Sequence, residues 1–146
     1  MHNSPALLEI NRLIMAITYR AGKEVEPNSL GDLFLSVNWP LGYQPDKLRR
    51  AFSRSDQVIT AWDGEKLVGL VNTIADGSVT AFIPYLLVNP EYQKQGIGGT
   101  LIGMIVSAYE GYERIVLLTE KETVDFYKKC GFVDAQGIHS MMITHQ

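Results

Sequence analysis

The sequence is poor in cysteine, in long apolar runs and in excess charge, and each shortage excludes a class of protein. A single cysteine, Cys130, among 146 residues excludes a disulfide framework within the chain, so we expect a reducing, cytoplasmic compartment. No apolar run approaches the roughly 18 residues of a membrane span, and we therefore expect no membrane partner. The 13 basic and 16 acidic residues leave a net charge of −3, without the basic excess typical of nucleic-acid-binding domains.

Two kinds of ligand site are also missing. The three histidines, His2, His139 and His145, lack the spacing of metal ligands, so no metal site is predicted. The chain has no Gly-Lys-Ser/Thr sequence, which excludes a P-loop. Composition leaves the oligomeric state open, and a homodimer is one of the alternatives.

The length of the chain indicates one domain with a substantial core. With 46% hydrophobic residues, 146 residues suit a single domain and leave little room for a second. Ser4-Pro5 followed by "ALLEINRLI" predicts a short helix, and "MAITYR" from Met15 alternates like a first strand. We therefore divide the chain into an N-terminal extension, 1–14, and one domain, 15–146.

The pattern of the domain predicts an α+β fold with a mixed sheet. Asp63-Gly64 and Asp76-Gly77 separate three apolar runs, which is a strong signal for hairpins. Pro84 cannot donate to a ladder, so the third strand should be bulged or unpaired on one side there. The expected order is β-α-α-β-β-β-α-β-α-β: helices over 29–39, 46–54, about 101–109 and 119–129, strands over 15–20, 57–62, 66–75, 79–88 and 114–119, and one or two closing strands after 132.

Three glycines, Gly96, Gly98 and Gly99, stand between an apolar run and a helical pattern. A glycine-rich turn at a helix start presents unpaired N–H groups and the positive end of the helix dipole, which together favour an anion. A Cβ at Gly96 or Gly98 would intrude on that anion. A dinucleotide fingerprint is excluded, because its third glycine would fall at Leu101 and because the preceding strands are antiparallel. The expected ligand carries phosphate.

The residues around these glycines resemble a known family. "QKQGIG" (93–98) is similar to the Q/R-x-x-G-x-G/A pattern of the GCN5-related N-acetyltransferases, the GNAT family, and "DFYKKCGF" (125–132) resembles the C-terminal helix motif of that family. The resemblance covers about 15–146 and implies the GNAT fold, in which helices cover both faces of a mainly antiparallel sheet and the fourth and fifth strands splay apart.

The resemblance also implies acetyl-CoA as the cosubstrate. Its pyrophosphate would rest on backbone N–H groups between Lys94 and Thr100, and its pantetheine arm on the exposed edge of the fourth strand. The cofactor-binding residues implied in this way are Leu86, Leu87, Val88, Gln93, Lys94, Gln95, Gly96, Ile97, Gly98, Gly99, Thr100 and Tyr127.

Three residues are candidates for the chemistry. Tyr127 matches the family tyrosine that donates a proton to the sulfur of coenzyme A, and the alternative role is a core aromatic. A backbone N–H at Leu87 or Val88 would polarise the thioester carbonyl. Tyr85 stands where many members carry a carboxylate, and Glu120 where they often carry Asn or Asp. Either Tyr85 or Glu120 would accept the amine proton through water, or Glu120 would only position the pantetheine.

The N-terminal half of the chain suggests which kind of amine accepts the acetyl group. "LFLSVNWP", "KLRRAFSRSDQVITAW" and "QGIHSMM" resemble the small N-acetyltransferases related to plant serotonin N-acetyltransferase, which have bacterial relatives. The resemblance places Trp39 and Tyr43 near the acceptor, where they would receive an aryl ethylamine or simply join two helices.

The predicted function is acetyl transfer from acetyl-CoA to a primary amine by direct attack in a ternary complex, with a small aryl- or alkylamine preferred. The alternatives are a protein-lysine acetyltransferase and a non-catalytic acyl-CoA-binding module.

Overall fold

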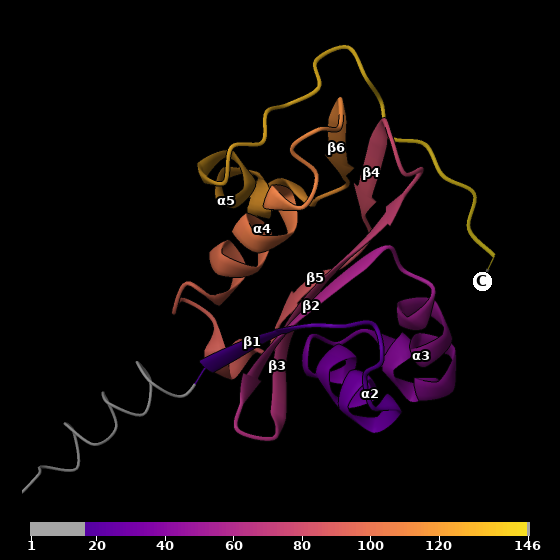
Figure 1. Cartoon of the computed structure of the whole chain (residues 1–146), viewed down its shortest axis with the longest axis vertical. Helices are drawn as coiled ribbons and strands as arrows, with labels where there is room; N and C mark the ends of the chain where they lie inside the picture. Colours follow the sequence, from indigo (N-terminus) through magenta and orange to yellow (C-terminus); the bar gives the residue numbers. More distant parts are fainter. Residues whose placement is uncertain (1–16, 146) are drawn as a thin grey trace, which may run out of the picture.

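The fold is that of a computed structural model, which describes residues 17–145. The predicted helix in 1–14 and the predicted strand start at Met15 lie outside the described residues. A central sheet carries α2 (Pro27–Ser36) and α3 (Pro45–Ser53) on one face and α4 (Ile97–Ser107) with α5 (Val124–Lys129) on the other (Figure 1). The prediction of helices on both faces of a mixed sheet is confirmed.

Hairpins build most of the sheet. Its strands are β1 (Ile17–Ala21), β2 (Gln57–Asp63), β3 (Lys66–Ala75), β4 (Thr80–Ile83), β5 (Leu86–Val88) and β6 (Arg114–Leu117). The order is β1-β2-β3-β4-β6, with β5 also paired to β3. Among the strand pairs of residues 17–145, only β4–β6 is parallel. Both Asp-Gly turns form as predicted, because Gly64 and Gly77 adopt φ of 60° and 86° and Asp76 accepts hydrogen bonds from the N–H groups of Ser78 and Val79.

Two helix starts differ from the predictions. The helix predicted from residue 29 begins earlier, since Pro27 is the first residue of α2, whose N-cap, Glu26, accepts hydrogen bonds from Asn28 N and Ser29 N. These two bonds lower the pKa of the Glu26 carboxyl. The helix predicted from residue 119 begins later, because a short 3-10 turn (Lys121–Thr123) precedes α5 and the Thr119 hydroxyl bonds to Glu120 O and to the Thr123 hydroxyl.

The predicted closing strands are also absent, because residues 130–145 contain no strand. Beyond the end of α5 this segment makes only local backbone hydrogen bonds, from Gln136 N to Asp134 O and from Ile138 N to Ala135 O. A strand requires a partner, and no described strand of the same chain supplies one here.

A polar chain of hydrogen bonds ties the far end of α4 to the sheet. Tyr109, just after α4, is buried, and its hydroxyl donates to Asp56 Oδ2 at 2.6 Å and contacts the Thr73 hydroxyl. Gln57 N donates to the same Thr73 oxygen. Burial first, and the bond to Asp56 second, raise the pKa of Tyr109 to about 12, so the phenol remains neutral at physiological pH.

We expect Tyr109→Phe to lower the free energy of unfolding by about 1–3 kcal/mol, because the buried Thr73 hydroxyl and Asp56 each lose a partner. Urea unfolding at neutral pH measures this. Tyr112→Phe is the matched control, since Tyr112 packs edge-on against Tyr109 with ring centroids 4.9 Å apart. It should change stability by less than about 0.5 kcal/mol. An equal loss in both variants would show that the hydroxyl network does not anchor α4.

Candidate functional site

The site begins where the predicted strand 79–88 is interrupted, so that two strands, β4 and β5, take its place. β4 pairs with β6 from Thr80 to Ile83, and after Ile83 the chain continues as β5, which pairs with β3 and with no other strand among residues 17–145. The splaying that the resemblance implied is therefore present, and one edge of β5 is open.

The pairing of β5 with β3 decides which backbone groups reach that edge. Asn72 N donates to Tyr85 O and Asn89 N donates to Val68 O, so alternate residues of the strand face β3. Leu87 lies opposite Leu70 in that series and uses its N–H there. The N–H groups of Leu86 and Val88 face the open edge. Of the two N–H groups predicted to polarise the thioester carbonyl, that of Val88 faces the open edge and that of Leu87 does not. Leu86 offers a further N–H group at this edge.

Asn72 stabilises the junction between β4 and β5. Its side chain is buried, accepts a hydrogen bond from Tyr85 N at 3.2 Å and donates to Ser55 Oγ at 3.0 Å. The amide therefore replaces the ladder bond that is lost beside Pro84. Sequence analysis missed this residue, although an asparagine inside the apolar run "LVGLVNTIA" was a signal of a buried polar role.

The second part of the site is the N-terminus of α4. Gly96 is its N-cap with φ of 83°, and Lys94 has φ of 65°, so the turn needs two left-handed residues. Thr100 N and the Thr100 hydroxyl both donate to Gly96 O at 3.0 Å, which closes the first helical turn. The four N–H groups before Thr100, those of Gly96, Ile97, Gly98 and Gly99, have no partner within the helix. Thr100 was predicted as a donor, but it uses both its N–H and its hydroxyl inside the helix.

Gly98 has a packing role besides the one predicted. A Cβ on Gly98 would lie 3.2 Å from Phe126 Cζ and 3.8 Å from Val88 Cγ2, so this glycine allows α4, α5 and β5 to approach closely. The expectation that its Cβ would intrude on a bound anion stays a prediction. At Gly96 and Gly99 a Cβ would meet no atom within 4 Å, and only Gly96 has a backbone conformation that disfavours a side chain.

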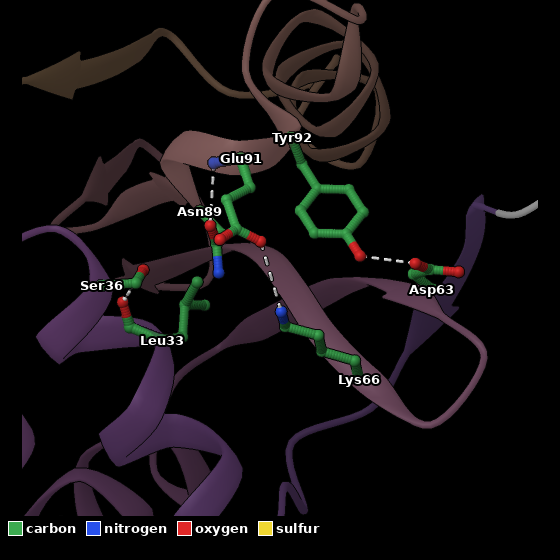
Figure 2. A network of polar contacts seen from close by, with 7 residues as sticks. All are labelled: Leu33, Ser36, Asp63, Lys66, Asn89, Glu91 and Tyr92. Atoms are coloured by element: carbon green, nitrogen blue, oxygen red, sulfur yellow. Dashed lines mark hydrogen bonds and ion pairs between the residues drawn. The ribbon is translucent and has the colours of Figure 1, made fainter. Parts of the chain in front are cut away.

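A clamp holds the turn between β5 and α4 (Figure 2). The Asn89 side chain accepts a hydrogen bond from Glu91 N at 2.9 Å and caps the 3-10 turn Pro90–Tyr92. Tyr92 donates its hydroxyl hydrogen to Asp63, and Glu91 lies 3.8 Å from Lys66 Nζ. Both contacts join the turn to the β2–β3 hairpin. The ion pair is exposed and contributes little, so we attribute the clamp mainly to Asn89 and Tyr92.

Gln93 connects the two parts of the site. Its side-chain nitrogen donates to Val88 O at 3.0 Å, at the open edge of β5. The predicted binding residues Gln93, Lys94 and Gln95 are all exposed.

Tyr127 lies on α5, on the α4 side of the sheet. A pair of backbone bonds, from Phe132 N to Tyr127 O and from Gly131 N to Lys128 O, ends α5 with Gly131 at φ of 100°, a left-handed conformation that favours glycine. The rings of Phe126 and Phe132 pack edge-on against Tyr127, with centroids 5.0 and 5.8 Å away. No described residue forms a hydrogen bond with the Tyr127 hydroxyl. Burial raises the pKa of Tyr127, with Cys130 as a smaller cause.

The other predicted site residues lie apart from Tyr127. Tyr85 is on the opposite face of the sheet, where it packs against Phe34 and Trp39 with ring centroids 5.2 and 5.4 Å away. Trp39 is 41% exposed and Tyr43 78% exposed, and only Trp39 joins this aromatic cluster. Glu120 is exposed just beyond β6, where β6 has diverged from β5.

Residues 17–145 contain no group of three or more His, Cys, Asp or Glu side chains that could hold a metal ion. None of their helices has the length and apolar character needed to cross a membrane.

The backbone geometry fits a ligand that carries both amides and phosphate. Leu86 and Val88 offer N–H groups along an open strand edge, as an extended chain with amides requires. The same edge leads through the Asn89 clamp to four unpaired N–H groups at a helix N-terminus, as a phosphate requires.

Comparisons with known proteins agree with this geometry. Residues 54–134 match the acetyltransferase (GNAT) domain family. The chain is 32% identical to GCN5-related N-acetyltransferase 2, chloroplastic, of Arabidopsis thaliana over 88% of its own length and 58% of that protein. It is 29% identical to histone acetyltransferase TAP1 of Glycine max, again over 88% of its length and 61% of that protein. The chain thus spans about three fifths of these two relatives. The solved structure of a GNAT family acetyltransferase from Streptococcus pneumoniae, 28% identical, superposes with a TM-score of 0.78 over 89% of this chain and 98% of that one.

Proposed function

Because the chain belongs to the acetyltransferase (GNAT) family, we propose that it transfers an acetyl group from acetyl-CoA to the nitrogen of a small primary amine. The observation that carries the proposal is the continuous path from the open edge of β5 to the unpaired N–H groups of α4. The pantetheine arm would pair with Leu86 and Val88, and the pyrophosphate would accept hydrogen bonds at Gly96–Gly99. In the same proposal, Gln93 orients the edge through its bond to Val88 O.

The chemistry in this proposal is direct attack in a ternary complex. Acetyl-CoA supplies an activated acyl group as its thioester. The N–H of Leu86 or Val88 would donate to the carbonyl oxygen and stabilise the negative charge that develops there. The Tyr127 hydroxyl, which has no partner among residues 17–145, would give its proton to the departing sulfur. Glu120 or Tyr85 would accept the amine proton through water.

The acceptor side of the proposal rests on Trp39 and Tyr85. These two rings are in contact, close to the junction between β4 and β5 where Tyr85 lies. Trp39 is half-exposed, so part of its ring is accessible to a ligand. A flat aryl group can stack there with little loss of rotational freedom. We therefore place a small aryl amine above an alkylamine, and we assign the protein to the cytoplasm, with no metal and no nucleic-acid partner.

A second candidate is a protein lysine. It is favoured by the similarity to a soybean protein named as a histone acetyltransferase. A third, a non-catalytic acyl-CoA-binding module, is motivated by Tyr85, which stands where a carboxylate would be a stronger base.

The experiment that tests the proposal follows the release of coenzyme A from acetyl-CoA with a panel of acceptors. The panel contains tryptamine, a simple alkylamine and a lysine peptide. We expect turnover with both small amines and a higher kcat/KM for tryptamine. Turnover of the peptide alone would support the lysine candidate, and binding of acetyl-CoA without any turnover would support the binding module.

Within the same assay, Trp39→Ala should raise KM for tryptamine on the order of 10-fold and leave KM for the alkylamine nearly unchanged, since only the aryl group loses its stacking surface. Tyr43→Ala is the matched control, because Tyr43 is more exposed and has no ring contact with the cluster. It should leave both values within about twofold. If Trp39→Ala raises KM for both amines equally, Trp39 joins α2 to the sheet and does not select the acceptor.

A further inference from the structure

The chain has one extra residue at the junction between β4 and β5. Ile74 pairs with Phe82 and Val71 pairs with Leu86, so two residues of β3 lie opposite three residues of the junction. Such a bulge leaves backbone groups without partners in the ladder, among them the N–H of Tyr85. Buried backbone groups need hydrogen-bond partners, so another part of the molecule has to supply them here.

Asn72, one of the two β3 residues opposite the bulge, holds both backbone groups of Tyr85. Its side-chain oxygen accepts a hydrogen bond from Tyr85 N at 3.2 Å, and its own N–H donates to Tyr85 O at 3.2 Å. Its side-chain nitrogen donates to Ser55 Oγ at 3.0 Å, and the Ser55 hydroxyl donates to Ala51 O of α3 at 3.1 Å. Asn72 and Ser55 are each 3% exposed, so water does not compete for these bonds. A buried chain of hydrogen bonds therefore connects α3 with the bulge.

The bond to Tyr85 O also fixes the direction of the next N–H group. The C=O of Tyr85 and the N–H of Leu86 belong to one planar trans peptide group, in which they point in opposite directions. Because Asn72 N holds this C=O toward β3, the N–H of Leu86 is directed at the open edge of β5. The bond to Tyr85 N fixes the preceding peptide group in the same way. Asn72 thus holds two successive peptide groups.

Of the two N–H groups at the open edge, that of Leu86 is farther from the proposed phosphate site. Val88 lies closer along the chain to Gly96–Gly99, and Gln93 donates to Val88 O. Two residues of a strand span about 7 Å. A molecule of acetyl-CoA that extends from α4 along β5 would therefore bring its acetyl end to Leu86, and Val88 N–H and Leu86 O would remain for the amides of the pantetheine arm.

We propose that the N–H of Leu86 donates to the thioester carbonyl of acetyl-CoA, and that Asn72, anchored by Ser55, is the positioning residue that directs this N–H. The inference rests on the proposed acetyl transfer. In that reaction the amine nitrogen bonds to the carbonyl carbon and loses a proton to the base, while an electron pair moves to the carbonyl oxygen. Return of this pair expels the thiolate of coenzyme A, which Tyr127 would protonate. An N–H that is already directed at the oxygen stabilises its negative charge without rearrangement of the backbone.

Kinetics of two variants test the role of Asn72. Asn72→Leu removes both side-chain hydrogen bonds, and kcat should fall at least about 10-fold because the N–H donor is displaced. Ser55→Ala keeps the bond to Tyr85 N but removes the anchor, so kcat should fall on the order of 5-fold. The ring of Tyr85 has its own contacts with Phe34 and Phe52, with centroids 5.2 and 6.0 Å away. KM for tryptamine and Kd for acetyl-CoA should therefore stay within about threefold in both variants.

Thr73→Val is the matched control. Thr73 is the next residue of β3, is equally buried and faces the other side of the sheet, where its hydroxyl contacts Gln57 N and the Tyr109 hydroxyl. The control should lose stability without a change at the bulge, and its kcat should stay within about twofold. A kcat within twofold of the wild-type value in Asn72→Leu or in Ser55→Ala overturns the proposal. An equal fall in Thr73→Val also overturns it, because loss of stability would then explain the effect.

Nuclear magnetic resonance identifies the donor without the need for turnover. Amide signals are compared between protein saturated with coenzyme A and protein saturated with acetyl-CoA, two ligands that differ only in the acetyl group. We expect the amide proton of Leu86 to lie further downfield with acetyl-CoA, that of Val88 to stay nearly unchanged, and the difference at Leu86 to shrink in Asn72→Leu. A difference at Val88 instead overturns the proposal.

The same measurement separates this inference from the proposed function. If acetyl-CoA binds and shifts the Leu86 amide but no acceptor is turned over, the proposed transfer fails while the role of Leu86 is supported. If acceptors are turned over and the Leu86 amide does not respond to the acetyl group, the transfer is supported and this inference fails. A wild-type chain that does not bind acetyl-CoA overturns both.

Discussion

Tyr127→Phe should lower kcat on the order of 100-fold and leave the affinity for acetyl-CoA nearly unchanged. The substitution removes one hydroxyl, which has no hydrogen-bond partner within residues 17–145, and keeps the ring between Phe126 and Phe132. The substitution should therefore raise the free energy of the transition state alone. A 100-fold loss of kcat corresponds to about 2.7 kcal/mol in this free energy.

The raised pKa of Tyr127 has a consequence for the pH profile. Burial keeps the phenol protonated, so it can act as an acid up to a pH above its ordinary value of about 10. Proton transfer from this phenol to a thiolate whose thiol has a pKa near 8.5 is uphill by about 2 kcal/mol or more. The transfer must therefore accompany cleavage of the bond between carbon and sulfur. We expect the alkaline limb of the kcat profile to lie above pH 10 and to disappear in Tyr127→Phe.

Steady-state kinetics with calorimetric titration of acetyl-CoA measures both effects. Tyr112→Phe is the matched control, because Tyr112 is another half-buried tyrosine packed against the same core, and its kcat should stay within about twofold. An unchanged kcat in Tyr127→Phe would mean that water protonates the sulfur and that Tyr127 is a packing residue.

Gly96→Val should weaken the binding of acetyl-CoA by about 2 kcal/mol or more, which is roughly 30-fold in Kd. The reason is the backbone, since φ of 83° is strained for a β-branched residue although a Cβ there would meet nothing within 4 Å. Valine would shift this residue toward negative φ and turn the first N–H groups of α4 away from the phosphates.

Two further variants separate this effect from packing. Gly103 lies on the same helix, has open space around the position of a Cβ and has no positive φ. The Kd of Gly103→Val for acetyl-CoA should therefore stay within about threefold of the wild-type value. Gly98→Val should press on Phe126 and thus displace α5, so we expect it to lower kcat as well as affinity. Calorimetry that finds equal Kd values for wild type and Gly96→Val would contradict the assignment of α4 as the phosphate site.

Several features could be predicted from short stretches because their hydrogen bonds close within a few residues. The Asp-Gly turns, the left-handed Gly131 at the end of α5 and the glycine-rich start of α4 belong to this class. The family could be predicted in the same way, because its two motifs lie at the starts or ends of helices. The role of Tyr127 and the cofactor-binding residues remain predictions that the variants above test.

Other features depended on contacts between distant segments. The register of β5 on β3, with Asn72 inserted beside Pro84, decides that Leu86 and Val88, and not Leu87, face the open edge. Packing of α5 against α4 gives Gly98 a contact with Phe126 that its position in the glycine-rich turn does not predict. The meeting of Trp39 with Tyr85, without Tyr43, has the same origin.

The sequence by itself therefore determined the succession of most helices and strands, the glycine-rich helix start and the family, since these depend on local hydrogen bonds and on periodicity. Only the tertiary structure decided which N–H groups stay free, which face each aromatic ring occupies and whether residues 138–144 form a strand. The C-terminal stretch shows the physical reason: its side chains favour a strand, but a strand exists only where another edge accepts its hydrogen bonds.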